Sequence, residues 1–228
     1  MTIHSPTLLF IKLPKTGGTS IESFLNRNFY CEDAQDSGFN GKVHPLTSVI
    51  THWGDHLLNS ITNPIDKKRI HKGLRFTVVR SPYSKCLSAY NYIRNHFKNP
   101  FLQDHDIETC LKQPHNFWNR HDYIHFYLSQ SQLLYEERIQ RNLTKGKLVD
   151  DTQYTYTPPE LTILKYENLN ESFKNFIKPL NSSVANINLP KFKKSNYTHH
   201  TLNRKCIDII NNIYHEDFIN FGYEKIKP

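Results

Sequence analysis

The chain has 228 residues, a length that suits one domain, residues 1–228, with a sizeable hydrophobic core. Its 29 Lys and Arg against 21 Asp and Glu give a formal net charge of +8, which suits an anionic ligand. The basic residues are scattered without a helix-turn-helix, zinc-finger or RNP-type signature, so we expect no nucleic-acid partner.

The first predicted element is a strand at 7–13 that runs into a lysine, two glycines and hydroxyl residues, and a helix over 19–29 follows. Glycines let the backbone approach a ligand, and a helix N-terminus presents N–H groups and the positive end of its dipole. The segment therefore predicts an anion-binding loop, although a plain strand–helix turn with a surface lysine is the alternative. The loop consists of Lys15, Thr16, Gly17, Gly18, Thr19 and Ser20.

The position of the lysine in this loop bears on nucleotide binding. In a Walker A loop the lysine follows the last glycine, whereas Lys15 precedes both glycines here. The chain also offers no convincing Walker B aspartate for Mg²⁺. A P-loop-like kinase therefore stays as an alternative with little support.

A second anion-binding segment follows a stretch, 44–61, that we expect to form short helical turns. A buried strand at 74–80 ends in Arg80, and an N-cap serine and a proline then begin a helix over 82–98. Open α/β sheets bind ligands at the carboxyl ends of their strands, where Arg80 lies. The arginine fork suits a terminal phosphate, and Ser88 is expected to face the same crevice.

The rest of the chain predicts further alternation of helices and strands. We expect a helical region at 104–130, a buried strand at 161–166, a helix capped by Asn170, and a helix over 201–215. Strands alternating with helices indicate an α/β fold. The predicted architecture is a P-loop-like three-layer domain whose mainly parallel sheet is flanked by helices.

Metal and redox chemistry find little support in the sequence. The cysteines at 31, 86, 110 and 206 form no CxxC pair, and Cys86 is expected to be a reduced, buried thiol. His52 and His56 lie four residues apart but lack the glutamate of a HEXXH motif and a third ligand, so we expect no metal site. Since no basic leader and no apolar run of membrane-spanning length is present, we expect a cytoplasmic protein without a membrane span, with an excised luminal domain as the alternative.

Several motifs together resemble one known family. The order strand, Lys15, two glycines, helix resembles the 5′-phosphosulfate-binding loop of sulfotransferases that use 3′-phosphoadenosine 5′-phosphosulfate (PAPS). The run from Arg80 through Lys85 to Ser88 resembles their 3′-phosphate-binding motif. The chain resembles the carbohydrate, or Golgi-class, sulfotransferases, which include short bacterial members. Further likeness lies at Gln130–Gln132, at Leu164–Leu169 (with Lys165-Tyr166 for the common Arg-Phe), at Leu189–Asn196 and at Ile213–Tyr223.

The resemblance implies a PAPS-dependent sulfotransferase that transfers a sulfuryl group to an acceptor hydroxyl of a saccharide or glycoconjugate, without a metal. It places Lys15 against the 5′-phosphate leaving group and makes His44 the general base, with His52 as second choice. The loop 15–20 would bind the donor's 5′ side. The residues implied for its 3′-phosphate are Arg80 and Ser88, with Lys194 or Ser195 closing over it. A non-enzymatic basic protein that binds glycans or nucleic acid is the remaining alternative.

Overall fold

The computed structural model describes residues 8–28, 48–52, 74–96, 105–112, 129–132, 134, 161–180, 182–190 and 202–227. The chain falls into two compact units. The first comprises residues 1–13, 17–78 and 135–192, and the second comprises 14–16, 79–134 and 193–228. Whether they make up one domain, as the sequence predicts, stays a prediction.

Among the described residues of the first unit, four strands form one sheet in the order β2-β1-β3-β4. Strand β1 (Leu8–Lys12) pairs in parallel with both β2 (Ser48–His52) and β3 (Leu74–Val79). The helical turns predicted over 44–61 are therefore wrong for 48–52. This stretch contains Val49, Ile50 and Thr51, whose branched side chains favour a strand, and β1 offers it a complete row of backbone partners.

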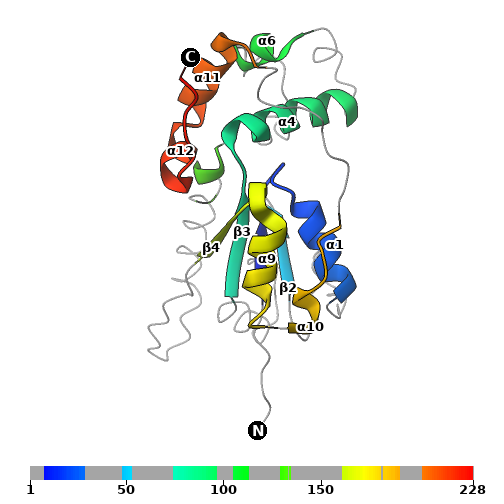
Figure 1. Cartoon of the computed structure of the whole chain (residues 1–228). Helices are drawn as coiled ribbons and strands as arrows, with labels where there is room; N and C mark the ends of the chain where they lie inside the picture. Colours follow the sequence, from blue (N-terminus) through cyan, green and yellow to red (C-terminus); the bar gives the residue numbers. More distant parts are fainter. Residues whose placement is uncertain are drawn as a thin grey trace, which may run out of the picture. The chain divides into compact units, whose positions relative to one another are not determined.

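Aromatic side chains hold two helices, α1 (Gly18–Asn28) and α9 (Leu169–Ile177), against the sheet. Phe10 and Phe76 stack with ring centroids 4.8 Å apart, while Phe24 of α1 meets Phe173 of α9 edge-on at 5.1 Å. Figure 1 shows α9 lying along the strands. Ile11 and Thr77, which point to the other face of the sheet, are buried as well. The predicted α/β class, a mainly parallel sheet flanked by helices, is confirmed.

Strand β4 (Leu161–Lys165) departs from the prediction of a buried strand. Leu164 is buried, but Ile163 is 43% exposed, because β4 is the last strand in the sheet order. Asn170 is not the expected helix cap, since α9 begins at Leu169 after a 3₁₀ turn at Tyr166–Asn168. Its side chain instead accepts a hydrogen bond from the backbone N–H of Leu189, beyond the short helix α10 (Ser182–Ala185).

In the described part of the second unit, four helices pack around a separate core. They are α4 (Pro82–His96), α6 (Ile107–Lys112), α11 (Arg204–Ile213) and α12 (His215–Phe221). The helix predicted over 201–215 is confirmed at 204–213. It ends before the fully buried Tyr214, and a second helix, which the sequence did not predict, starts at His215. Of the helical region predicted over 104–130, the described residues are helical at 107–112 and at 130, where a short helical turn begins. Cys86 is a buried free thiol, as expected.

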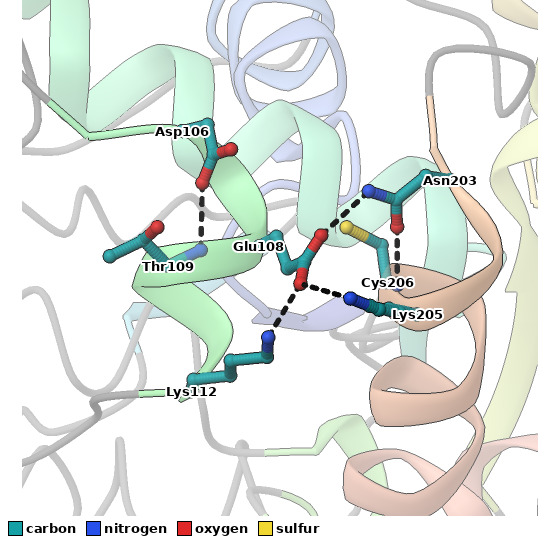
Figure 2. A network of polar contacts seen from close by, with 7 residues as sticks. All are labelled: Asp106, Glu108, Thr109, Lys112, Asn203, Lys205 and Cys206. Atoms are coloured by element: carbon teal, nitrogen blue, oxygen red, sulfur yellow. Dashed lines mark hydrogen bonds and ion pairs between the residues drawn. The ribbon is translucent and has the colours of Figure 1, made fainter.

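Polar contacts join α6 to the start of α11 (Figure 2). The Asn203 side chain caps α11, since its Oδ1 accepts from the backbone N–H of Cys206 at 2.8 Å. The same amide donates to Glu108 Oε2 at 2.7 Å, and Glu108 also accepts from Lys112. One asparagine thus begins a helix and connects it to its neighbour.

We expect Asn203→Ala to lower the free energy of unfolding by ~1–2 kcal/mol, because it removes a helix cap. Asn168→Ala is the matched control, since Asn168 holds the N-cap position of α9 without a side-chain capping bond. Urea unfolding of both variants measures the difference. Equal losses in the two variants would contradict the capping role of Asn203.

Candidate active site

Lys15 adopts a backbone conformation that is costly for a lysine. Its φ of 63° makes it the one non-glycine residue with positive φ in the described part of the chain. This left-handed conformation costs on the order of 1–2 kcal/mol and persists where surrounding contacts enforce it. One such contact is a hydrogen bond of 3.3 Å that its carbonyl oxygen accepts from Arg80 Nη1.

The ammonium group of Lys15 lies in an unusual electrostatic environment. Its Nζ lies 3.6 Å from the centroid of the Tyr92 ring, a cation–π contact. Burial, and next the nearby Arg80 guanidinium, lower the Lys15 pKa from 10.5 to about 8. Within the described residues no carboxylate pairs with this ammonium. Two neighbouring cations repel each other, so an anion bound beside them gains from both.

Arg80 is fixed through both its backbone and its side chain. Its N–H donates to Gln130 Oε1 at 2.7 Å and its C=O accepts from Gln130 Nε2 at 2.8 Å. The guanidinium Nε donates to Ser84 Oγ at 2.9 Å. The serine on this guanidinium is therefore Ser84, which the sequence did not single out.

Helix α4 presents one accessible stripe toward these cations. Between Pro82 and Ile93 every residue is buried except Ser84, Ser88 and Tyr92. The spacing of four places all three on one helix face. Ser84 contacts Arg80 and Tyr92 contacts Lys15, so the predicted Ser88 lies on the same face between two residues that touch the cations. The i, i+4 spacing was the sequence signal that could have revealed Ser84 and Tyr92.

Lys85 is a core residue, although it occupies the basic position of the phosphate-binding pattern. It is fully buried, and its Nζ lies 4.7 Å from the Tyr214 ring centroid. Burial lowers its pKa to about 8, against the opposing influence of the nearby Asp217 carboxylate. Lys85 therefore belongs to the helix packing of the second unit and not to an accessible anion site.

In the first unit, the two glycines of the loop are required sterically. Gly17 has φ 87°, and a Cβ there would lie 2.7 Å from Tyr166 Cδ2. A Cβ on Gly18 would lie 2.6 Å from Lys12 Cγ. Only glycine fits at these positions without movement of those side chains. Tyr166, at the Phe position of the common Arg-Phe pair, thus limits the shape of the turn that begins α1.

The structure places one of the two candidate bases. His52 ends β2 in register with Lys12, so its backbone lies at the carboxyl edge of the sheet beside the end of β1. His44, Lys194 and Ser195 lie outside the described residues. Thr19 is exposed and Ser20 is half-buried in the first turn of α1, while Thr16 is fully buried.

No group of three or more His, Cys, Asp and Glu side chains within the described residues could hold a metal ion. Among the helices of the described ranges, none is long and apolar enough to cross a bilayer.

In the first unit, a glycine turn leads from a parallel strand into a helix, an arrangement typical of proteins that bind phosphate-like anions. The sequence matches the model of the sulfotransferase family over residues 1–224, and the chain belongs to that family. The match confirms the predicted family and enzyme class, a PAPS-dependent sulfotransferase.

The other comparisons add little. A crystal structure of mouse sulfotransferase SULT7A1 complexed with PAP (3′-phosphoadenosine 5′-phosphate) is 12% identical in sequence. The match covers 97% of this chain and 68% of that chain with a TM-score of 0.35, too low to support an argument. No curated protein matches the sequence significantly.

The depressed Lys15 pKa predicts a pH-dependent stability. An unfolded lysine keeps its proton up to about pH 10.5, so between pH 8 and 10.5 the unfolded state binds more protons than the folded state. The free energy of unfolding of the wild type should therefore rise with pH in this window relative to Lys15→Met, by at most ~1.4 kcal/mol per pH unit. Below pH 8 the two curves should run parallel. Urea unfolding at several pH values measures this, and parallel curves throughout would refute the lowered pKa.

Proposed function

We propose that this enzyme binds PAPS with Lys15 and Arg80 as its principal cations and transfers the sulfuryl group to a hydroxyl of a saccharide or glycoconjugate. The observation that carries the proposal is the contact between these two residues, which holds two positive charges together beside the accessible face of α4. A donor with phosphate groups at both its 5′ and 3′ positions matches two fixed cations. The structure thus fits the donor class that the family membership implies.

Lys15 is the proposed electrostatic catalyst. As the sulfuryl group leaves, the bond from sulfur to the bridging oxygen breaks and negative charge grows on the 5′-phosphate. A preorganised cation stabilises that charge more in the transition state than in the ground state. The Tyr92 ring and the Arg80 bond hold Lys15 in one arrangement, so little reorganisation is needed. PAPS already contains an activated mixed anhydride, so this mechanism requires no metal.

The remaining donor contacts follow from the loop and from α4. Backbone N–H groups and hydroxyls of Thr16, Gly17, Gly18, Thr19 and Ser20 would bind the 5′ side, supported by the dipole of α1. Arg80 and Ser88 would bind the 3′-phosphate, with Ser84 keeping the guanidinium oriented. Lys194 or Ser195 completes the proposed set.

A histidine is the proposed general base that takes the acceptor's proton as its oxygen bonds to sulfur. The family pattern favours His44, and the position of His52 at the carboxyl edge beside β1 supports it as the second choice. An alanine variant of this histidine should lose turnover but keep its affinity for PAP, because the base faces the acceptor and not the donor. A saccharide is the proposed acceptor because the motifs follow the carbohydrate class, and the net charge of +8 suits an anionic one.

The cofactor claim is tested by thermal shifts with PAP, AMP and ATP. PAP at ~100 times its Kd should add ~2.7 kcal/mol of stability, which raises the melting temperature by roughly 5–10 °C. The shift should need no Mg²⁺ and should shrink with salt. AMP should give a smaller shift, and Arg80→Ala should reduce the PAP shift to the AMP value.

Two outcomes would remove the proposal. Equal shifts from PAP and AMP in the wild type would contradict the use of a 3′-phosphate. A large ATP shift that depends on Mg²⁺ would indicate a kinase instead.

We expect Lys15→Ala to lower kcat by roughly 10²–10³-fold, because it removes a charge that stabilises the leaving group. Affinity for PAP should fall much less, since Arg80 remains. Mass-spectrometric detection of sulfated acceptors from a glycan panel measures turnover. A Lys15→Ala enzyme with near wild-type kcat would contradict the assigned role.

A further inference from the structure

The side-chain amide of Gln130 forms two hydrogen bonds with the backbone of Arg80. Its Oε1 accepts from the Arg80 N–H at 2.7 Å, and its Nε2 donates to the Arg80 C=O at 2.8 Å. Strand β3 ends at Val79, so a side-chain amide pairs both backbone groups of the next residue, as a neighbouring strand would. Gln130 itself is fully buried.

Asp217 of α12 fixes the orientation of this amide. Its carboxylate accepts from Gln130 Nε2 at 3.1 Å, from the Gln130 backbone N–H at 2.9 Å and from the Ser131 backbone N–H at 2.7 Å. A flipped amide would turn its oxygen toward the carboxylate and lose both donated bonds. Asp217 is fully buried, and the buried Lys85 is the cation near it. A series of hydrogen bonds therefore connects Asp217 in the helix core through Gln130 to Arg80 in the candidate site.

We propose that Gln130 is a positioning residue for 3′-phosphate recognition: it holds the Arg80 backbone so that the guanidinium lies between Ser84 and the Lys15 carbonyl. The guanidinium can keep both contacts only if the backbone from which it extends is fixed. An arginine fork gains its specificity from geometry, so a displaced backbone would weaken binding of a 3′-phosphate more than binding of a 5′-phosphate.

This inference rests on the proposed use of PAPS. Its test distinguishes a failure of the Gln130 role from a failure of the proposed function. Calorimetry gives the Kd of PAP and of AMP on the same preparation, and the ratio of the two constants reports 3′-phosphate selectivity. A lower folded fraction or a general loss of stability leaves this ratio unchanged, so a merely structural role of Gln130 would not move it.

We expect Gln130→Ala to reduce the selectivity ratio roughly tenfold, within the range of coupling between contacting residues. Gln130→Glu should also reduce it, because a carboxylate cannot donate to the Arg80 carbonyl and repels Asp217. Gln132→Ala is the matched control on the same helical turn. Gln132 is exposed and bonds the Ser129 backbone N–H, so its variant should keep the wild-type ratio.

The decisive comparison uses the Arg80→Ala background. If Gln130 acts through Arg80, then adding Gln130→Ala to Arg80→Ala should change the ratio no further. If both Gln130 variants keep the wild-type ratio although Arg80→Ala loses selectivity, the positioning role of Gln130 is overturned. Wild-type protein without any preference for PAP overturns the proposed function itself.

Discussion

The hydrogen bond from the Arg80 guanidinium to the Lys15 carbonyl oxygen is the interaction on which the candidate site depends. It joins a strand end to a loop 65 residues earlier in the chain, holds Lys15 near its left-handed conformation, and brings two cations together. Burial, and next repulsion from the Arg80 guanidinium, lower the Lys15 pKa. The free protein thus stores electrostatic free energy that an anionic donor would release on binding, which is how a preorganised site favours charge that develops during a reaction.

Two fully buried charged residues, Lys85 and Asp217, support this arrangement from the core of the second unit. Burial lowers the pKa of Lys85, and the nearby Asp217 carboxylate opposes this shift. The Asp217 carboxylate accepts hydrogen bonds from the backbone N–H and side-chain amide of Gln130 and from the backbone N–H of Ser131, and these bonds offset the cost of burying it. Much of the likeness to sulfotransferase motifs at Gln130 and at Asp217 therefore reflects one hydrogen-bond network and not two separate features.

Helix α4 shows how one element serves packing and chemistry together. Its residues are buried around most of the circumference, and the remaining stripe carries two serines and a tyrosine. The Tyr92 ring contacts the Lys15 ammonium through a cation–π interaction. A carboxylate in its place would have neutralised the ammonium, whereas the uncharged ring leaves the attraction of Lys15 for an anion intact. Ser84 orients Arg80 in a similar way, through a neutral hydroxyl.

The sequence by itself determined the parts that depend on local order. The loop with Lys15 before two glycines, the strand that ends at Arg80, and the helix after it follow from periodicities of two and 3.6 and from turn residues, which act between neighbours. The tertiary structure alone decided that Lys85 faces the core, that 48–52 joins the sheet, that Tyr92 lies against Lys15, and that Gln130 binds the Arg80 backbone. In the sequence, Arg80 lies 50 residues from Gln130, and Gln130 lies 87 residues from Asp217. Residues so far apart leave no local pattern in the sequence, because only the packing of the folded chain brings them within hydrogen-bond distance.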